Sequence, residues 1–246
     1  MKNLNIIVTA GSTREYIDPV RFISNASTAH MGHEIAKEAK ARKHNVLLIS
    51  GPTFLKPLKK IKCIHIETAK QLKGALLKHY KWADCVIMTA AVSDFTPIKY
   101  MSKKIKRKKK IKLHLKPTED ILELIGKRKG YRILVGFCLE SANIIKNALE
   151  KMKKKNLDII VANKIARNYI PFGFGIKEFF FIDKRHAEVK RITGTKTQLA
   201  KNLLSKIEQL TLMARYPSRK GAVCKTVMRG CNSHPRLQLL CERAFE

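Results

Sequence analysis

The sequence predicts an α/β fold with three layers: a mostly parallel, Rossmann-like sheet, helices on both faces, and a small β-ribbon or hairpin. Short apolar runs alternate along the chain with amphipathic stretches of about 10–14 residues, the pattern of parallel strands joined by crossover helices. The chain has 246 residues, which is enough for a sizeable core. Its apolar runs fall far short of the ~18–20 residues that a membrane span needs.

In the first half of the chain, each expected strand is a run of apolar or β-branched residues, and each helix carries apolar residues on one face. The helix that begins near residue 30 has Met31, Ile35 and Ala39 at helical spacing. The expected elements are a strand at 3–9, a helix at 30–43, strands at 45–50 and 61–66, a helix at 68–80 and a strand at 84–89.

The second half continues the alternation after one interruption. Residues 99–116 are so rich in lysine that like charges repel, which predicts a mobile loop leading into a β-ribbon. The expected elements after it are a helix at 119–127, a strand at 133–137, a helix at 142–155, a strand at 157–162, a hairpin at 179–183 and 189–192, and a helix at 197–209. We expect one domain over 1–212, followed by a poorly ordered appendage over 213–246.

The net charge leaves two functional classes open. Lysine and arginine number 51 against 19 acidic residues, a formal net charge of +32. This charge favours a basic nucleic-acid-binding protein on a Rossmann-like scaffold. A general richness in lysine explains it equally well, because arginine and aromatic residues, on which nucleic-acid readers depend, are few.

Cysteine usage and the N-terminal sequence predict a cytoplasmic protein. The six cysteines show no CxxC pair and no metal-ligand spacing, so reduced core cysteine is the better interpretation. The first residues lack the apolar stretch and small-residue cleavage site of a signal peptide.

Three segments after predicted strands carry small or polar residues suited to a ligand. Gly11, Ser12 and Thr13 follow the first strand and would let backbone N–H groups approach a phosphate. Asn25 lies in a hydroxyl-rich segment before a helix, where ordinary capping is the simpler interpretation. Ala90 and Asp94 follow the strand at 84–89, where a loop-capping aspartate is equally compatible.

Two groups of lysines are further candidates. Lys104 lies in the basic run and fits either a phosphate clamp or a solvated loop. Lys151 and Lys155 are four residues apart and therefore share one helix face, although surface lysines are the default explanation. A Rossmann-type oxidoreductase is disfavoured, because GxGxxG does not follow the first strand and no acidic residue follows the second at the required place.

The order and spacing of these segments resemble phosphopantothenoylcysteine synthetase, the ligase half of the bifunctional coenzyme A biosynthesis flavoprotein family. The resemblance covers about residues 4–210. It is carried by the segments TAGSTREYIDPVRFISNASTAHMG, AAVSDFTP, KKIKR, KPTEDIL, VGFCLES and LDIIVANK. The flavin-binding decarboxylase half has no counterpart in this sequence, so we expect a free-standing synthetase.

The resemblance implies CTP-dependent ligation of 4′-phosphopantothenate to L-cysteine through an acyl-cytidylate, with Mg²⁺. It implies catalytic roles for Asn25 and Lys104, and substrate binding by Arg21 and Asn25. The nucleotide-binding residues that it implies are Gly11, Ser12, Thr13, Ala90, Asp94, Lys104, Thr118, Glu119, Asp120, Ile121, Phe137, Lys151 and Lys155. The metal ligands stay unassigned.

The resemblance also implies a homodimer and a separate phosphopantothenoylcysteine decarboxylase as a partner, with no membrane and only non-specific nucleic-acid contact. Three residues depart from the family pattern beside the implied site. Ser12 stands where the family usually has glycine, and Ala29-His30 stand in place of Gly-Lys. These changes bear on turnover rather than on the fold.

Overall fold

The computed structural model describes residues 3–107, 110–165, 173, 175–184 and 188–215, without the side chains of 188 and 213–215. The chain forms two compact units, Met1–Arg132 and Ile133–Glu246. The first unit contains the motifs that follow the early strands, and the second contains the later ones.

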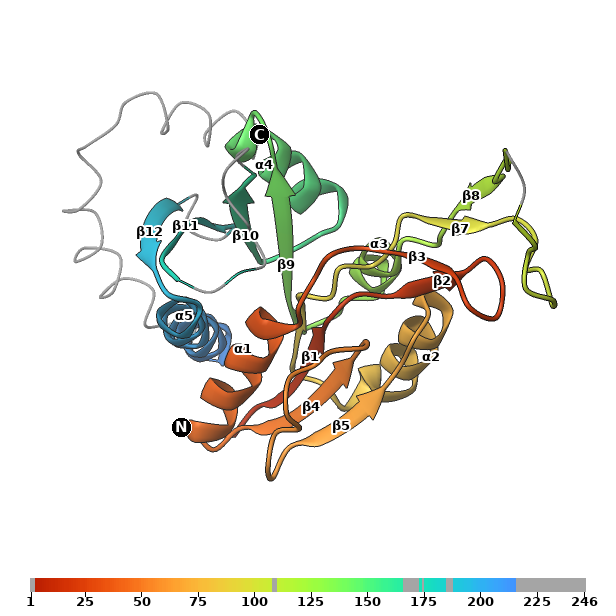
Figure 1. The fold of residues 1–246 in the computed structure, drawn as a ribbon. Helices are drawn as coiled ribbons and strands as arrows, with labels where there is room; N and C mark the ends of the chain where they lie inside the picture. Colours follow the sequence, from red (N-terminus) through yellow and green to blue (C-terminus); the bar gives the residue numbers. More distant parts are fainter. Residues whose placement is uncertain (1–2, 108–109, 166–172, 174, 185–187, 216–246) are drawn as a thin grey trace. The chain divides into compact units, whose positions relative to one another are not determined.

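The first unit is built on four parallel strands in the order β6-β1-β4-β5. They are β1 (Asn5–Ala10), β4 (Asn45–Ser50), β5 (Lys62–His65) and β6 (Cys85–Met88). The side chains of Ile6, Ile7 and Val8 in β1 are fully buried, as expected for a central strand covered on both faces. Figure 1 shows α1 (His30–Ala41) and α2 (Ala69–His79) on opposite faces of these strands.

Polar side chains fix the helix ends of this unit. Thr68 and Gln71 form a reciprocal capping box at the start of α2. The Glu15 carboxylate, which is buried, also accepts a hydrogen bond from Ala69 N at 2.8 Å. Asp120 caps the start of α3 (Ile121–Lys127). The short 3₁₀ helix η1 (Tyr80–Trp82) is joined to α3 by a hydrogen bond from Tyr80 Oη to Ile125 O.

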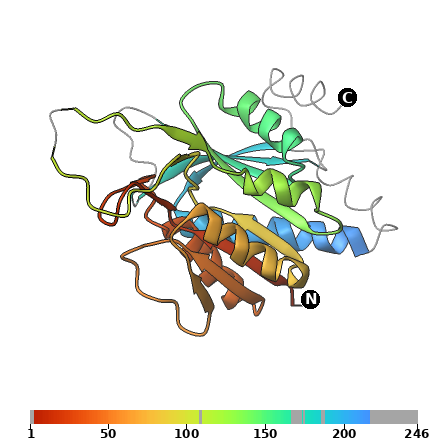
Figure 2. The same ribbon diagram turned by 90° about the vertical axis from the view of Figure 1, so that its right-hand side faces the viewer.

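Two small hairpins extend the first unit beyond its sheet. One pairs β2 (Arg14–Tyr16) with β3 (Phe22–Ser24), and the sequence did not predict it because each strand has only three residues. The other pairs β7 (Phe95–Pro97) with β8 (Leu115–Pro117) and confirms the predicted β-ribbon. Figure 2 shows the lysine-rich segment reaching outward from this second hairpin.

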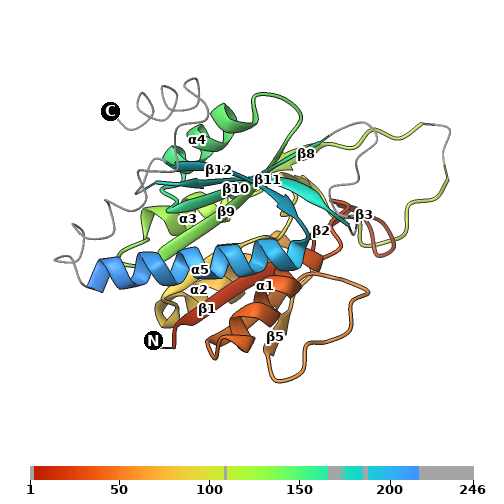
Figure 3. The same cartoon turned by 90° about the vertical axis from the view of Figure 1, so that its left-hand side faces the viewer.

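The second unit combines one parallel strand pair with an antiparallel hairpin, in the order β12-β11-β10-β9. Figure 3 shows its two helices on opposite faces of these strands. Its elements are β9 (Ile133–Glu140), α4 (Ile144–Lys154), β10 (Ile159–Lys164), β11 (Lys177–Asp183), β12 (Glu188–Gly194) and α5 (Lys196–Arg215).

The predicted fold class is confirmed in its layers, its mostly parallel strands and its hairpins. Two predicted boundaries are wrong, since β9 continues to Glu140 and α5 continues to Arg215. Both segments beyond the predicted ends lack the glycine or proline that normally signals a stop. The predicted appendage therefore begins inside α5, and its remainder, from residue 216, lies outside the described residues.

Helix α1 packs unusually close to the strand ends because of Gly32. A Cβ built at this position would lie 2.6 Å from Ala10 Cβ, 2.6 Å from Thr89 Oγ1 and 3.0 Å from Thr9 O. No side chain fits this space unless the helix moves away from β1 and β6. Gly74 in α2 is different, because its Cβ would meet no atom within 4 Å.

We therefore predict that Gly32→Ala lowers the free energy of unfolding by about 1–3 kcal/mol through overpacking. Gly74→Ala is the matched control and should raise it by up to about 1 kcal/mol, since alanine is the better helix former. Chemical denaturation of the two variants measures both effects. A Gly32→Ala protein as stable as the wild type would contradict the close packing of α1.

A pair of buried lysines marks the edge of the second unit. Lys177 in β11 pairs in register with Gly194 in β12, and Lys196 follows Gly194 by two residues. The exposed fractions are 7% for Lys177 and 6% for Lys196. Burial, together with the neighbouring Lys177 ammonium, lowers the pKa of Lys196 to about 8.

This pKa predicts a rise in stability at alkaline pH. Between about pH 8 and the ordinary lysine pKa of 10.5, the unfolded chain binds a proton that folded Lys196 does not. The free energy of unfolding should therefore increase with pH across this window, and Lys196→Met should reduce the increase. Urea denaturation at several pH values measures the slope. An identical slope in the variant would show that Lys196 does not titrate in this window.

Candidate functional site

The strand order of the first unit places a binding site beside β1. From β1 the chain moves outward to β4 and β5 and then returns to β6 on the other side of β1. Ligands of open α/β sheets bind beyond the carboxyl ends of the strands at such a reversal. The loops that follow β1 and β6 are the ones at this point, and both were singled out from the sequence.

These two loops stay paired after their strands have ended. Ser12 and Ala91 form an isolated parallel bridge. Ala91 N donates to Gly11 O at 2.8 Å, and Thr13 N donates to Ala91 O at 3.3 Å. The amides of Thr13 and of Arg14, which donates to Glu67 O at 2.6 Å, therefore support the loops themselves and do not face an open phosphate site.

Gly11 is required by this arrangement. Its φ of 78° lies in the left-handed region, which favours glycine. A Cβ at Gly11 would also lie 3.1 Å from Gly51 O at the end of β4. The residues that follow β1 and β4 can approach each other this closely only because both are glycine.

Hydroxyl groups join a third loop to the same place. Ser93 N donates to the buried Thr13 Oγ1 at 2.9 Å. Thr118 Oγ1 donates to Ser93 O at 2.6 Å, and Thr118 N donates to Asp94 O at 2.9 Å. The loops after β1, β6 and β8 thus form one connected surface.

Asn25 points its amide at the loop after β6. Its Nδ2 donates to Ala91 O at 3.2 Å and to Val92 O at 3.0 Å. Two carbonyl acceptors fix which end of the amide faces the loop, since only the nitrogen can donate. An aspartate here would place a carboxylate against two carbonyl oxygens, so the position discriminates between the two side chains.

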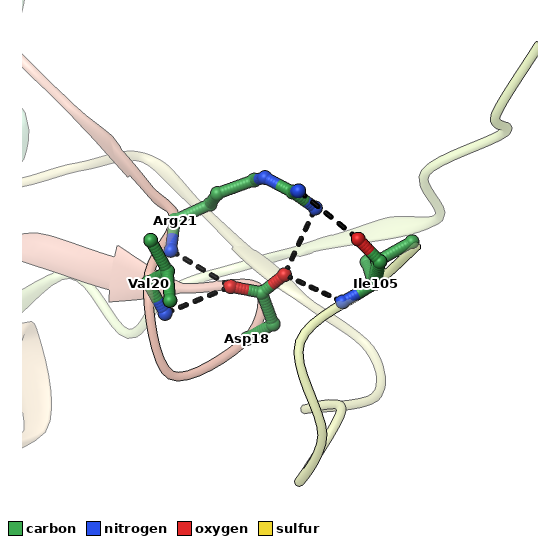
Figure 4. Close-up of polar contacts among 4 residues, drawn as sticks. All are labelled: Asp18, Val20, Arg21 and Ile105. Carbon is green, nitrogen blue, oxygen red and sulfur yellow. Dashed lines mark hydrogen bonds and ion pairs between the residues drawn. The ribbon is translucent and has the colours of Figure 1, made fainter. Parts of the chain in front are cut away.

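Lys104 is exposed and lies outside this connected surface. Its neighbour Ile105 is held by the β2–β3 turn, as Figure 4 shows. Ile105 N donates to Asp18 Oδ2 at 3.1 Å, and Arg21 Nη2 donates to Ile105 O at 3.0 Å. Arg21, predicted to bind substrate, therefore contacts the lysine segment and also forms an ion pair with Asp18 at 3.0 Å.

The remaining predicted residues are divided between local structural roles and the second unit. In the first unit, Glu119 forms an ion pair with Lys73, Asp120 accepts from Glu123 N as the α3 cap, and Ile121 is buried. The structure gathers Gly11, Ser12, Thr13, Asn25, Ala90, Asp94 and Thr118.

Three predicted nucleotide-binding residues belong to the second unit. Lys151 Nζ donates to Phe137 O at 2.9 Å, which ties α4 to β9. Lys155 is the C-terminal cap residue of α4. Their predicted contact with a nucleotide stays a prediction.

The two departures from the family pattern at 29–30 form the start of α1. Ala29 is the N-cap residue with a φ of 68°, a conformation that glycine adopts at lower cost. His30 Nε2 lies 3.8 Å from the Glu34 carboxylate. The alanine therefore adds backbone strain at the start of α1.

Asp18 is the functional candidate that the sequence reasoning missed. In the sequence, the dipeptide Asp18-Pro19 indicates only a turn. Nothing in it predicts that the Asp18 carboxylate contacts Ile105, more than eighty residues away. The carboxylate is fully buried. Burial alone raises the pKa of Asp18, but the amides of Val20, Ile105 and Arg21 and the Arg21 guanidinium together lower it below its ordinary value.

Among the described residues, no group of three or more histidine, cysteine, aspartate or glutamate side chains could hold a metal ion. These residues do not by themselves fit a protein-built Mg²⁺ site, although Mg²⁺ is often held mainly by substrate phosphates and water. In the same part of the chain, no helix combines the length and apolar character needed to cross a membrane.

Comparison with known proteins gives one consistent family. The model of the DNA/pantothenate metabolism flavoprotein C-terminal domain matches residues 1–211. A cysteine/cysteine sulfinic acid decarboxylase from an unknown prokaryotic organism is 40% identical over 211 residues, covering 85% of this chain and 58% of that protein. The coenzyme A biosynthesis bifunctional protein CoaBC of Bacillus subtilis is 41% identical over 193 residues, covering 77% and 48%.

Comparison with solved structures points to the same family. A crystal structure of the C-terminal domain of a CoaBC protein has a TM-score of 0.72 and 33% identity, covering 86% of this chain and 97% of that one. The chain spans about half the length of the curated relatives that it matches.

Proposed function

This chain belongs to the family of DNA/pantothenate metabolism flavoprotein C-terminal domains, and from this membership we propose that it ligates 4′-phosphopantothenate to L-cysteine in coenzyme A biosynthesis. The observation that carries the proposal is the position of Asn25. The residue implied by the family motif hydrogen-bonds the loop after β6, at the strand-order reversal where open α/β sheets bind ligands.

The proposed reaction has two steps. An oxygen of the phosphopantothenate carboxylate attacks the α-phosphorus of CTP, and the bond to pyrophosphate breaks, leaving an acyl-cytidylate. The cysteine amine then attacks the acyl carbon, CMP leaves with the bridging oxygen, and the amine loses a proton as the amide forms. Both steps develop negative charge on oxygen, which positioned donors stabilise.

The roles of this chain's residues follow from their chemistry. The two hydrogens of Asn25 Nδ2 are directed at the loop carbonyls of Ala91 and Val92, so donation to the acyl oxygen would replace one of these two hydrogen bonds. Lys104 offers a compact positive charge for the transferring phosphate. CTP rather than ATP is part of the proposal, and Mg²⁺ would neutralise the triphosphate.

A homodimer also belongs to the proposal. Large apolar side chains are exposed on the two hairpins and the segment after β7, a surface that a second copy of the chain would cover. They include Val20, Phe22, Phe95, Ile98 and Tyr100. A separate decarboxylase would consume the product. Nucleic-acid contact through the basic segment would be non-specific and salt-sensitive.

Pyrophosphate release tests the function directly. We expect release only when 4′-phosphopantothenate and a nucleoside triphosphate are both present, and phosphopantothenoylcysteine, identified by mass, only when cysteine is added. The value of kcat/KM should be much higher for CTP than for ATP, because the wrong base leaves buried polar groups unpaired. Release that does not depend on phosphopantothenate would overturn the proposal.

Asn25→Asp should slow amide formation more than nucleotide transfer. The carboxylate cannot donate to the acyl oxygen, so acyl-cytidylate should accumulate, and quenched-flow analysis of the bound intermediate measures it. The same substitution also turns a carboxylate toward two loop carbonyls. Equal slowing of pyrophosphate release and amide formation would therefore identify Asn25 as a loop support only.

Lys104→Gln should lower turnover by roughly two orders of magnitude, because a positioned charge on the transferring phosphate is lost. Lys110→Gln is the matched control from the same basic segment, with an equally exposed side chain. It should have little effect, since screened surface charges are nearly interchangeable. Small and equal effects of the two substitutions on pyrophosphate release would remove Lys104 from the mechanism.

A further inference from the structure

The segment that carries Lys104 touches the rest of the first unit at few points. Every residue from 98 to 107 is exposed except Ile105, which is partly buried. The run Lys103, Lys104, Lys106 and Arg107 surrounds Ile105 with four positive charges. Like charges at this spacing repel, so the segment needs a tether if Lys104 is to hold one position.

Asp18 supplies this tether. Its Oδ1 accepts hydrogen bonds from Val20 N and Arg21 N, both at 2.8 Å. Its Oδ2 accepts from Arg21 Nη1 at 3.0 Å and from Ile105 N at 3.1 Å. One carboxylate oxygen thus closes the β2–β3 turn, while the other faces the lysine segment (Figure 4).

Arg21 completes the hold on the same peptide. Its Nη1 pairs with Asp18, and its Nη2 donates to Ile105 O at 3.0 Å. Both the N–H and the C=O of Ile105 are therefore bound by one ion pair. Hydrogen bonds to charged groups are about twice as strong as neutral ones, and the Asp18 carboxylate is fully buried, which protects the bond from water. A second link, Met101 N to Ile17 O at 2.9 Å, joins the same turn to the segment.

We propose that Asp18 is a positioning residue for Lys104, which it places by holding the backbone of Ile105 through its own carboxylate and through Arg21. The tether itself follows from the contacts above, whereas its consequence for catalysis rests on the proposed function of Lys104. The pKa of Asp18 lies below its ordinary value, so the carboxylate stays ionised at neutral pH and keeps the tether closed.

Asp18→Asn should remove the contacts to Ile105 and the Arg21 guanidinium while keeping the hydrogen bonds that close the β2–β3 turn. The remaining side-chain oxygen can still accept from Val20 N and Arg21 N. The new amide nitrogen, however, is a donor and would face two donors, Ile105 N–H and the Arg21 guanidinium. Asp84→Asn is the matched control, because Asp84 Oδ2 accepts from Asn5 N at 2.8 Å at the opposite end of the strands.

Amide hydrogen exchange tests the tether without any substrate. In the wild type, the amide of Ile105 should exchange more slowly than those of Lys104 and Lys106. Asp18→Asn should raise the Ile105 rate about tenfold or more, and Asp84→Asn should leave it unchanged. Arg21→Gln, which keeps the carboxylate in place, should raise it less. An unchanged Ile105 rate in a folded Asp18→Asn protein would overturn the tether. If that variant does not fold, a wild-type Ile105 amide that exchanges as fast as the amides of Lys104 and Lys106 would overturn the tether instead.

A double-mutant cycle tests the catalytic consequence. Asp18→Asn should lower kcat for pyrophosphate release about tenfold when Lys104 is present and less than about twofold in the Lys104→Gln background. Equal losses in both backgrounds would show that Asp18 acts on stability alone. A wild-type protein that releases no pyrophosphate would refute the proposed function, while the exchange rates would still decide the tether.

Discussion

The close approach of backbones beyond the carboxyl end of β1 is the constraint on which the candidate site depends. A Cβ at Gly51 would lie 2.1 Å from Ser12 O, and a Cβ at Gly32 would meet Ala10 and Thr89 at 2.6 Å. Because these positions are glycine, β4 and α1 come close enough for the loop after β1 to pair with the loop after β6. Asn25 then finds the carbonyls of Ala91 and Val92 within hydrogen-bond distance.

The few acidic residues of this basic chain do more than balance charge. Several buried or partly buried carboxylates accept backbone N–H groups where elements begin or loops turn. Asp84 holds Asn5 at the start of β1, Asp158 holds Leu134 in β9, Glu15 holds Ala69 in α2, and Asp18 holds Ile105. Each of these carboxylates thereby fixes a backbone amide of another segment of the chain.

The sequence was sufficient for the layers of the fold and for the loops of the site, because hydrophobic periodicity marks buried strands and strand ends mark where loops gather. It missed the β2–β3 hairpin, whose strands are too short to show alternation. It also missed Asp18, since the partner Ile105 is distant in sequence and is bound through its backbone, which carries no residue signature. The amide of Thr13 was among those expected to approach a phosphate, but it donates to Ala91 O in the neighbouring loop.

The proposed ligation begins with attack of a carboxylate oxygen at the α-phosphorus of CTP, and isotope transfer is the sharpest test of this step. The substrate would be 4′-phosphopantothenate with ¹⁸O in its carboxylate, turned over with CTP and cysteine, and the nucleotide and phosphate products would be weighed by mass spectrometry. We expect CMP that carries one ¹⁸O, since the bridging oxygen leaves with the nucleotide. Unlabelled nucleotide together with ¹⁸O in inorganic phosphate would contradict the proposed step, because the activated species would then be an acyl phosphate.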